Sequence, residues 1–386
     1  MIEQHEQLDF HGLDMQDVYS AEYTGQVEAI RFEAALVLSR IAMRHIFASG
    51  AAQHDRTARP PRSVVERQPF FFRKRLIEYL DDRGELLRDG TQYRPTSGLI
   101  ERAEMSDQAY FGGESHSPTF AAMRCIEAIA GGVLQGRDGL VLLEEKFGPA
   151  ETWRIWDYLM VDAAPKRACN SLAARALDHR LSTGLPTVVF EGGAGLGATI
   201  REALQIEGFR RRAQLISLFG FTDISRPLIK RAKNMLADTA PELLEVMTFD
   251  RVDLDVLDEY EDLPYLQDGA TDVIIFESVL HDVENLHRVL TACRRILKPG
   301  GWLAFTIGSR GRPGMFFPFE MLQSTLHSYY RAELDPPRRT NVGYLTINEW
   351  KTSLLDAGFT DFQIFPAISD HEKWPYGGIV ARTGSP

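Results

Sequence analysis

Acidic side chains and one histidine follow short apolar runs of the kind that form buried strands. Glu191 directly follows the run VVF, Asp223 lies four residues after the run LISLF, and His281 lies five residues after the run TDVIIF. A carboxylate accepts hydrogen bonds from amines and hydroxyls, and a histidine exchanges protons near neutral pH because its unperturbed pKa is about 6.5. This combination predicts a polar ligand site with one acid–base residue.

The elements that would position these side chains alternate between strand and helix patterns. Because the carboxyl ends of parallel strands meet at one edge of a sheet, the acids and the histidine should share that edge. We therefore predict an α/β fold, with a doubly wound, Rossmann-like sheet in a domain of residues 185–386. The expected strands cover 188–190, 215–219, 246–249, 271–276 and 302–306, and the expected helices cover 198–206, 227–236 and 286–297.

A glycine-rich turn joins the first expected strand to the first helix. Positions 192, 193, 195 and 197 are all glycine, so the backbone there can adopt positive φ angles and come close to a ligand. The free N–H groups of the following helical turn would face that ligand. Such a turn is a weak signal by itself, and it gains weight from the acid that ends the second strand.

Asp223 has two alternative roles. At the end of a second strand, a carboxylate can accept hydrogen bonds from both hydroxyls of a ribose. The spacing from the glycines exceeds the roughly 20 residues of the dinucleotide fingerprint, and the linker Glu207–Ala213 would absorb the excess. The alternative is that Asp223 caps the next helix, for which Ser225 is better placed.

The N-terminal half divides into three predicted regions. Residues 1–20 are polar and predicted to be flexible. Residues 21–110 combine two helical patterns with a short hairpin around Asp89-Gly90, which predicts a winged-helix-like domain. Residues 111–184 are helical but interrupted by glycines and Pro149, and we predict a helical lid or linker there.

Two groups of residues in this half are candidates for binding. The lid region is rich in aromatic residues, and Trp156 and Tyr158 are candidate substrate or lid residues, although such stretches more often belong to a core. The winged-helix region carries a basic cluster of Arg67, Arg73, Lys74 and Arg75. One interpretation of the winged-helix region is that this cluster binds DNA. The alternative is that the region is a scaffold that packs on the C-terminal domain or pairs two subunits.

Composition limits the remaining functions. A net charge of −11 and a pI near 5.5 argue against a general nucleic-acid or membrane-surface binder and favour the scaffold. Three cysteines lie far apart, without metal-ligand spacing, so we expect reduced structural thiols, no metal and a cytoplasmic protein. The start of the chain is not a signal peptide, and no apolar run approaches the roughly 20 residues of a membrane span.

The successive motifs resemble one family. The stretches EGGAGLGAT, FTDIS, DVII…VLHD and ILKPGGWL are similar to the motifs of class I S-adenosylmethionine-dependent methyltransferases. The likeness is to the C-methyltransferase domains of polyketide synthases and related natural-product enzymes, and it includes the later segment LTINEW…LL…AGF. It is strong from Val188 to Phe359 and looser upstream.

The resemblance implies a role for each matching residue. Glu191, Gly193 and Gly195 would contact the amino-acid part of the cofactor, Asp223 would bind the ribose, and Asp253 with Leu254 would lie at the adenine. Glu277 also falls among the cofactor-binding positions, and His281 falls on the family's catalytic histidine. Histidine suits the removal of a proton from a hydroxyl or an activated carbon.

This chain also departs from the family's pattern. Gly192 and Leu196 stand where isoleucine and threonine are usual, and Glu277-Ser278 stand where serine-asparagine is usual. C-methylating members pair the histidine with a glutamate near the end of the fifth strand, where this chain has residues 304–308 without an acid. Asp282, Glu277 or Glu320 are therefore candidates to orient the ring of His281.

The sequence thus predicts a methyltransferase that acts on a small molecule or a carrier-bound intermediate of polyketide-type biosynthesis. The methyl acceptor, whether carbon, oxygen or nitrogen, stays open. The alternative is an enzyme that keeps the cofactor pocket for a non-methylating reaction such as a cyclisation or rearrangement. Glu320 and His327 are further candidate substrate or lid residues, Arg210–Arg212 and Arg338-Arg339 are candidate docking residues for a carrier, and a homodimer is possible.

Overall fold

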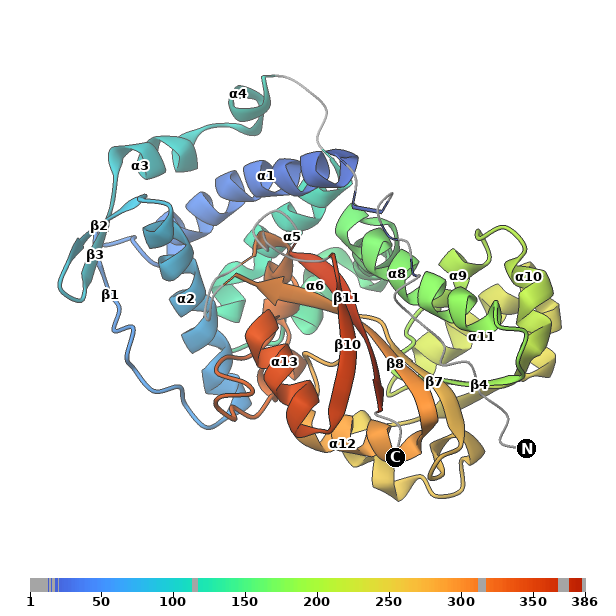
Figure 1. Ribbon diagram of the computed structural model, residues 1–386. Helices are drawn as coiled ribbons and strands as arrows, with labels where there is room; N and C mark the ends of the chain where they lie inside the picture. The colour runs from blue at the N-terminus through green and yellow to red at the C-terminus, as the bar shows by residue number, and fades with distance from the viewer. Residues whose placement is uncertain are drawn as a thin grey trace.

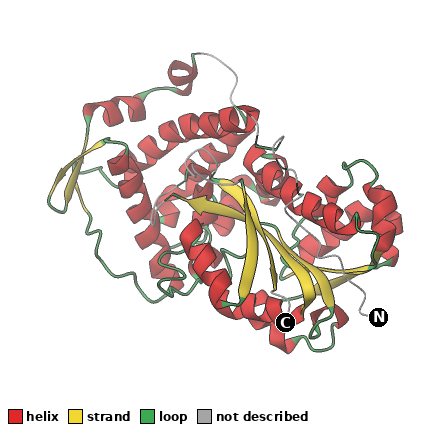
Figure 2. Cartoon of the chain, in the orientation of Figure 1, coloured by secondary structure: helices red, strands yellow, loops and turns green. Residues whose placement is uncertain are grey.

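The computed structural model describes residues 13, 15, 18, 19, 21–112, 117–311, 317–366 and 375–383. A twisted sheet lies at the centre of the C-terminal half, with helices on both of its faces and a largely helical N-terminal region beside it (Figures 1 and 2). The predicted flexible segment 1–20 lies almost entirely outside the described residues.

Eight strands form the main sheet within the described residues, in the order β10-β11-β8-β7-β4-β5-β6, with β9 beside β8. Neighbours from β6 to β8 run parallel, and β11 runs antiparallel to β8 and β10. The strand order reverses between β4 and β7, and doubly wound sheets bind ligands beyond the strand ends at such a point. The bounds are β4 Thr187–Glu191, β5 Ile216–Asp223, β6 Met247–Arg251, β7 Thr271–Phe276, β8 Leu297–Arg310, β9 Leu345–Thr346, β10 Phe359–Phe365 and β11 Tyr376–Thr383.

Alternate residues of the strands pack against helices on opposite faces of this sheet. Val189 and Ile275 belong to one core, whereas Phe190 and Phe276 belong to the other. A sheet covered on both faces requires continuous apolar strands, and every residue of β7 is buried. The first core includes α8 (Ala164–Leu181), α9 (Ala198–Ala203) and α11 (Arg226–Thr239), and the second includes α12 (Leu286–Ile296) and α13 (Ile347–Asp356).

The N-terminal region contains the helices and the hairpin that the sequence predicts. A small sheet in the order β1-β3-β2 accompanies the helices, as in a winged helix, and Pro149 occupies the first turn of its helix as expected. The boundaries assigned to the predicted domains remain a prediction. The elements are α1 Ala21–His45, β1 Ala52–Gln53, α2 Val64–Asp82, β2 Leu86–Asp89, β3 Gln92–Pro95, α3 Ser97–Glu104, α4 Asp107–Phe111, α5 Pro118–Val133, α6 Gly139–Phe147 and α7 Pro149–Asp157, followed by a π-helical turn at Tyr158–Asp162.

The basic cluster of α2 does not form an exposed patch. Arg75 is 2% exposed and donates hydrogen bonds to the Tyr329 hydroxyl at 3.0 Å and to the Val342 carbonyl at 2.6 Å. Arg67 donates to the Ala332 carbonyl at 2.9 Å. Two of the four cations therefore hold α2 against residues 329–342 of the C-terminal half.

The limits of the second and fifth strands differ most from those expected. The second strand does not stop at Gly220 but continues through Asp223. Gly220 is needed for packing, because a Cβ there would lie 2.5 Å from the ring of Tyr265. The turn at Lys298–Gly301 lies within β8, where the pairing with β7 shifts register. The first change places Asp223 on the strand itself.

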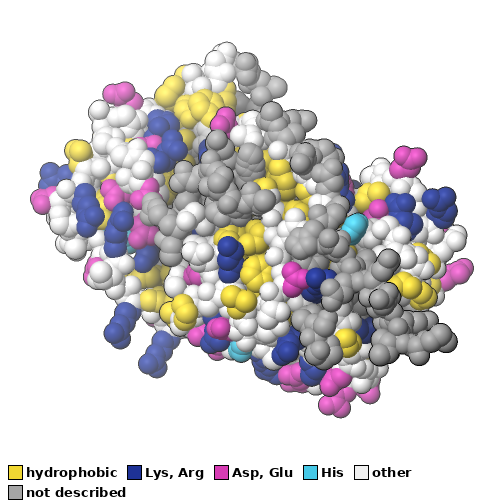
Figure 3. All heavy atoms as spheres, viewed as in Figure 1, with side chains coloured by type: hydrophobic (Ala, Val, Ile, Leu, Met, Phe, Trp, Pro, Cys, Tyr) yellow, Lys and Arg dark blue, Asp and Glu magenta, His cyan; other side chains and the backbone are white. Residues whose placement is uncertain are grey.

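No helix of the described residues combines the length and the apolar character needed to cross a bilayer. On the face of the molecule in Figure 3, acidic and basic side chains are interspersed. Charge on this face is therefore mixed rather than concentrated in one sign.

Candidate active site

Glu191 ends β4 and is buried without a hydrogen-bonded partner. The side chain is 1% exposed, and neither carboxyl oxygen has a hydrogen bond of ordinary geometry to any described residue. Burial raises the pKa of Glu191 to about 8, while the nearby Thr199 hydroxyl opposes the rise and the carboxylates of Glu277 and Asp223 add to it. Since leaving such a group unpaired is costly, Glu191 is poised to receive a cationic or hydrogen-bonding ligand group.

The glycine turn beyond Glu191 packs closely on both neighbouring strands. Gly193 has φ +62°, and a Cβ there would lie 2.6 Å from Val279, so only glycine fits. Gly195 has φ +53°. A Cβ added to Gly195 would lie 3.8 Å from its nearest neighbouring atom, which is a backbone oxygen. The turn is thus held against the β7 loop while leaving space beside Gly195.

Asp223 joins the glycine turn to the start of α11. Its carboxylate accepts hydrogen bonds from the N–H groups of Gly195 at 3.0 Å and Ser225 at 2.7 Å. Burial raises the pKa of Asp223, and these two hydrogen bonds oppose the rise. Ser225 occupies the N-cap position but makes no side-chain cap, so Asp223 reaches the helix entrance as well as the turn.

Asp253 and Leu254 follow β6, and Leu254 lies next to Gly192. Asp253 caps the short helix at Leu254–Glu259 by accepting a hydrogen bond from the Asp255 N–H at 3.1 Å. Leu254 is buried, and its Cδ2 would lie 2.9 Å from a Cβ on Gly192. Because neighbouring side chains fill the space beside Gly192, this position has no room for a side chain of its own.

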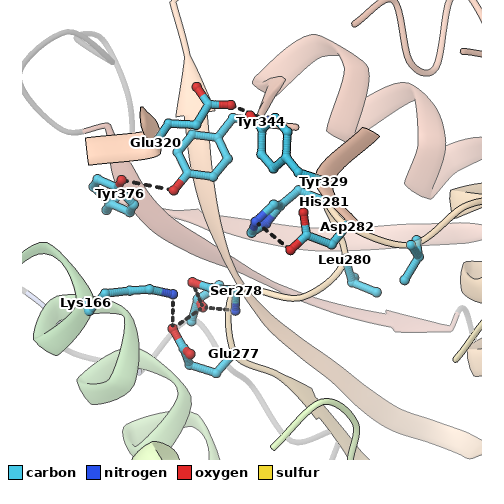
Figure 4. A network of polar contacts seen from close by, with 12 residues as sticks. Lys166, Glu277, Ser278, Leu280, His281, Asp282, Glu320, Tyr329, Tyr344 and Tyr376 are labelled. Atoms are coloured by element: carbon cyan, nitrogen blue, oxygen red, sulfur yellow. Dashed lines mark hydrogen bonds and ion pairs between the residues drawn. The ribbon is translucent and has the colours of Figure 1, made fainter. Parts of the chain in front are cut away.

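His281 is a buried side chain on the loop after β7. The ring is 1% exposed, and its Nε2 lies 3.6 Å from Asp282 Oδ2, so one of the candidate orienting acids does face it (Figure 4). Tyr344 contacts it edge-on with ring centroids 4.9 Å apart. Burial lowers the pKa of His281 well below its ordinary value, and the cations of Lys166, Arg339 and Arg310 lower it further, whereas the nearby amide of Gln323 opposes the shift. The imidazole of His281 is therefore neutral at neutral pH.

Arg339 holds the loop that carries His281. Its guanidinium donates to the carbonyls of His281 at 2.7 Å, Val283 at 2.8 Å and Leu280 at 3.5 Å. Because Arg339 is 1% exposed, it cannot serve in a surface docking patch, and that prediction is wrong for this residue. Its neighbour Arg338 is paired with Asp335 and Asp356.

Glu277 and Lys166 form an ion pair below the His281 loop. Lys166 Nζ lies 3.3 Å from Glu277 Oε1, and the two side chains are 2% and 13% exposed (Figure 4). Thr306, on β8, contacts the same carboxylate oxygen at 3.5 Å. Next to Glu277, Ser278 takes a φ of +52°, a strained angle for a residue other than glycine.

Glu320 and His327 do not join His281. Glu320 is fully buried, and its partners are the guanidinium groups of Arg310 and Arg75 and the Tyr344 N–H at 3.1 Å. His327 lies 3.2 Å from Gln68 Oε1 and 3.0 Å from the Gly136 carbonyl through its Nε2. Both residues fasten the insertion after β8 to the N-terminal helices.

Trp156 and Tyr158 pack against the N-terminal helical core. The Tyr158 hydroxyl lies 2.6 Å from the Thr119 hydroxyl, and Trp156 is half-buried. The same helix is tied to α11 by Arg231, which lies 2.9 Å from Asp157 and over the ring of Trp153. The aromatic segment is thus attached to the helix that follows Asp223, as a lid over that side would be.

Lys166 and Arg339 also lie near His281, and neither residue is predicted there from the sequence. For Lys166 a signal was present, since it shares one face of α8 with Cys169, Asn170 and Ala173, all buried. Within the described residues, no group of three or more His, Cys, Asp or Glu side chains is arranged to hold a metal ion.

Comparison with known proteins identifies the domain. Residues 193–305 match the family described as methyltransferase domain. A highly reducing polyketide synthase of Aspergillus niger is 30% identical over 203 residues, which is 51% of this chain and 8% of that protein. The chain therefore matches only a small part of that relative's length.

Solved structures share the fold over nearly the whole chain. The DszA carbon methyltransferase is 19% identical, with a TM-score of 0.70 and coverage of 95% of this chain and 94% of that one. The trans-methyltransferase CalH, solved in complex with S-adenosylhomocysteine, is 18% identical, with a TM-score of 0.60 and coverage of 93% and 92%. Residues 193–305 thus match a methyltransferase domain, and the chain shares the fold of solved carbon methyltransferases and resembles part of a polyketide synthase.

Proposed function

We propose that this chain methylates the α-carbon of a thioester-bound polyketide intermediate, with His281 as the general base. The observation that carries the proposal is the state of His281: it is buried, surrounded by cations and neutral, beside the cofactor edge of the sheet. A hydrogen flanked by a ketone and a thioester is acidic enough for such a base to remove. Likeness to a polyketide synthase and to a carbon methyltransferase supports carbon as the acceptor.

The residues around the glycine turn fit the cofactor. The unpartnered carboxyl of Glu191 would pair with the ammonium of the methionine part. Asp223 would accept hydrogen bonds from the ribose hydroxyls. Asp253 and Leu254 would border the adenine. S-adenosylmethionine, when bound, supplies an electrophilic methyl group and leaves as S-adenosylhomocysteine.

The acid that supports His281 comes from a different position than in the family's pattern. The fifth strand carries Thr306 in the region where a glutamate is usual, and its hydroxyl contacts Glu277 rather than the histidine. Asp282 Oδ2 faces the ring at 3.6 Å instead, and partial burial raises the pKa of this carboxyl. In its charged form, a carboxyl so placed would stabilise the imidazolium once it forms.

The test supplies wild-type protein with deuteromethyl-labelled S-adenosylmethionine and acetoacetyl-pantetheine, and follows both compounds by mass spectrometry. We expect a labelled methyl group on the thioester and loss of turnover by roughly 10²- to 10⁴-fold in His281→Asn, the range for loss of a general base. Conversion of a substrate without consumption of the methyl donor would favour the non-methylating alternative. Turnover of His281→Asn near the wild-type rate would remove the base role.

A further inference from the structure

A lysine is buried at the edge of the sheet where this chemistry would take place. Lys166 lies in the first turn of α8, directly after Pro165, and its side chain extends from that helix toward Glu277 at the end of β7 (Figure 4). Its side chain is 2% exposed. Burying an ammonium group is costly, and one long ion pair at 3.3 Å does not by itself offset that cost, so this position calls for a reason beyond folding.

We propose that Lys166 is a catalytic residue that donates a hydrogen bond to the oxygen of the substrate's enolate as that enolate forms. This assignment rests on the proposed function. It differs from the role of His281, which takes the proton.

The geometry leaves Lys166 free to donate. An ammonium has three N–H donors, and the described residues supply one acceptor, Glu277 Oε1, at 3.3 Å. Glu277 is held in turn by Thr306 from the neighbouring strand β8 at 3.5 Å. The ion pair is therefore fixed by α8, β7 and β8 together, so the ammonium is oriented before substrate arrives.

The charge of Lys166 also acts on the residues of the His281 loop. After burial, Lys166 is the strongest of the charges that lower the pKa of His281, and it lowers that of Asp282 as well. These groups lie on the same side of the strand ends (Figure 4). A substrate that offers its α-hydrogen to His281 would thus lie within the field of Lys166.

The proposed step balances as a proton transfer. The α-carbon–hydrogen bond of the thioester breaks, the proton moves to a ring nitrogen of His281, and the bonding electron pair moves onto the carbonyl oxygen. Lys166 donates an N–H to that oxygen and keeps its own proton. A donor that is already oriented where negative charge develops contributes about 10²- to 10³-fold to the rate. Glu277 keeps the pair neutral before the substrate binds.

The experiment measures two rates for acetoacetyl-pantetheine. One is the exchange of the α-hydrogen with deuterium oxide in the presence of S-adenosylhomocysteine, above the uncatalysed rate, and it needs no methyl transfer. The other is methyl transfer at saturating substrate. The variants are Lys166→Met, the double variant Lys166→Met with Glu277→Gln, and the control Arg167→Met, which removes an exposed cation one residue along the same helix.

We expect both rates to fall 10²- to 10³-fold in Lys166→Met and in the double variant, with Arg167→Met unchanged. The double variant leaves no unpaired buried charge, so it guards against misfolding, and circular dichroism confirms the fold. Because Glu277 is also a candidate cofactor residue, the double variant is compared with Glu277→Gln alone at saturating cofactor. If Lys166 served only to neutralise Glu277, these two variants would have equal rates, which would overturn the assignment. Rates of Lys166→Met within threefold of wild type would also overturn it. A wild-type protein that neither exchanges nor methylates the probe refutes the proposed function itself.

Discussion

Binding of the nucleoside should release a proton from Glu191. The pKa of this buried carboxyl is raised to about 8, so at pH 7 about nine-tenths of the molecules carry the proton there. A ligand ammonium placed against the carboxylate favours its charged form and brings the pKa back toward the ordinary value of about 4.3. The predicted release is therefore about 0.9 proton per S-adenosylhomocysteine bound at pH 7, falling to about 0.1 at pH 9, where Glu191 is already ionised.

Isothermal titration calorimetry gives this number directly. The observed enthalpy, plotted against the ionisation enthalpy of a series of buffers, has the number of exchanged protons as its slope. Glu191→Gln should abolish the release and weaken binding roughly 10- to 100-fold, the value of one hydrogen bond to a charged group. The ligand's own amino group is largely protonated in free solution at pH 7, so its proton uptake adds little to the slope at that pH.

Glu207→Gln is the matched control, since Glu207 is an exposed carboxylate in the linker that follows α9. It should bind and release like wild type. A slope near zero for wild type at pH 7, or an equal slope for Glu191→Gln, would refute the placement of the ammonium at Glu191.

Three further predictions concern His281 and its loop. Because the pKa of His281 is lowered, the acid limb of the profile of log kcat should fall below pH 6.5; a limb at or above 6.5 would contradict burial of a neutral ring. The same shift should lower the free energy of unfolding, measured by urea titration, as the pH falls below about 6.5, since the unfolded chain then binds a proton that the folded chain does not. Arg339→Met should lower the unfolding free energy by about 2–4 kcal/mol in urea titrations and reduce kcat at least tenfold, because three loop carbonyls lose their donor. Arg338→Met, which removes a partly exposed neighbour, should do neither, and equal losses in both variants would contradict the positioning role.

The sheet and the acids at its edge were predictable because they depend on local pattern. A run such as TDVIIF is buried on both faces wherever it occurs in a parallel sheet, and residues that follow such runs arrive at the same edge. The contact between Gly195 and Asp223 follows from the neighbouring positions of β4 and β5. Gly220 misled the strand assignment because the need for glycine comes from Tyr265, 45 residues later in the chain.

The burial of Arg339 was not predictable from local pattern. Arg338-Arg339 is expected to form a docking patch on the surface, yet Arg339 is buried and Arg338 is partly exposed. Which of the two is buried depends on the phase of this loop against the distant loop that carries His281. The same holds for Glu320, whose partner Arg75 comes from the N-terminal helix α2.

The position of the transferred methyl group distinguishes carbon methylation from the other reactions. Wild-type protein is given S-adenosylmethionine carrying ¹³C in the methyl group, together with acetoacetyl-pantetheine, and the product is examined by carbon NMR. We expect all of the enriched carbon to be bonded to the carbon between the ketone and the thioester. Enrichment on an oxygen, or a methyl donor that stays intact while the thioester changes, would contradict carbon methylation.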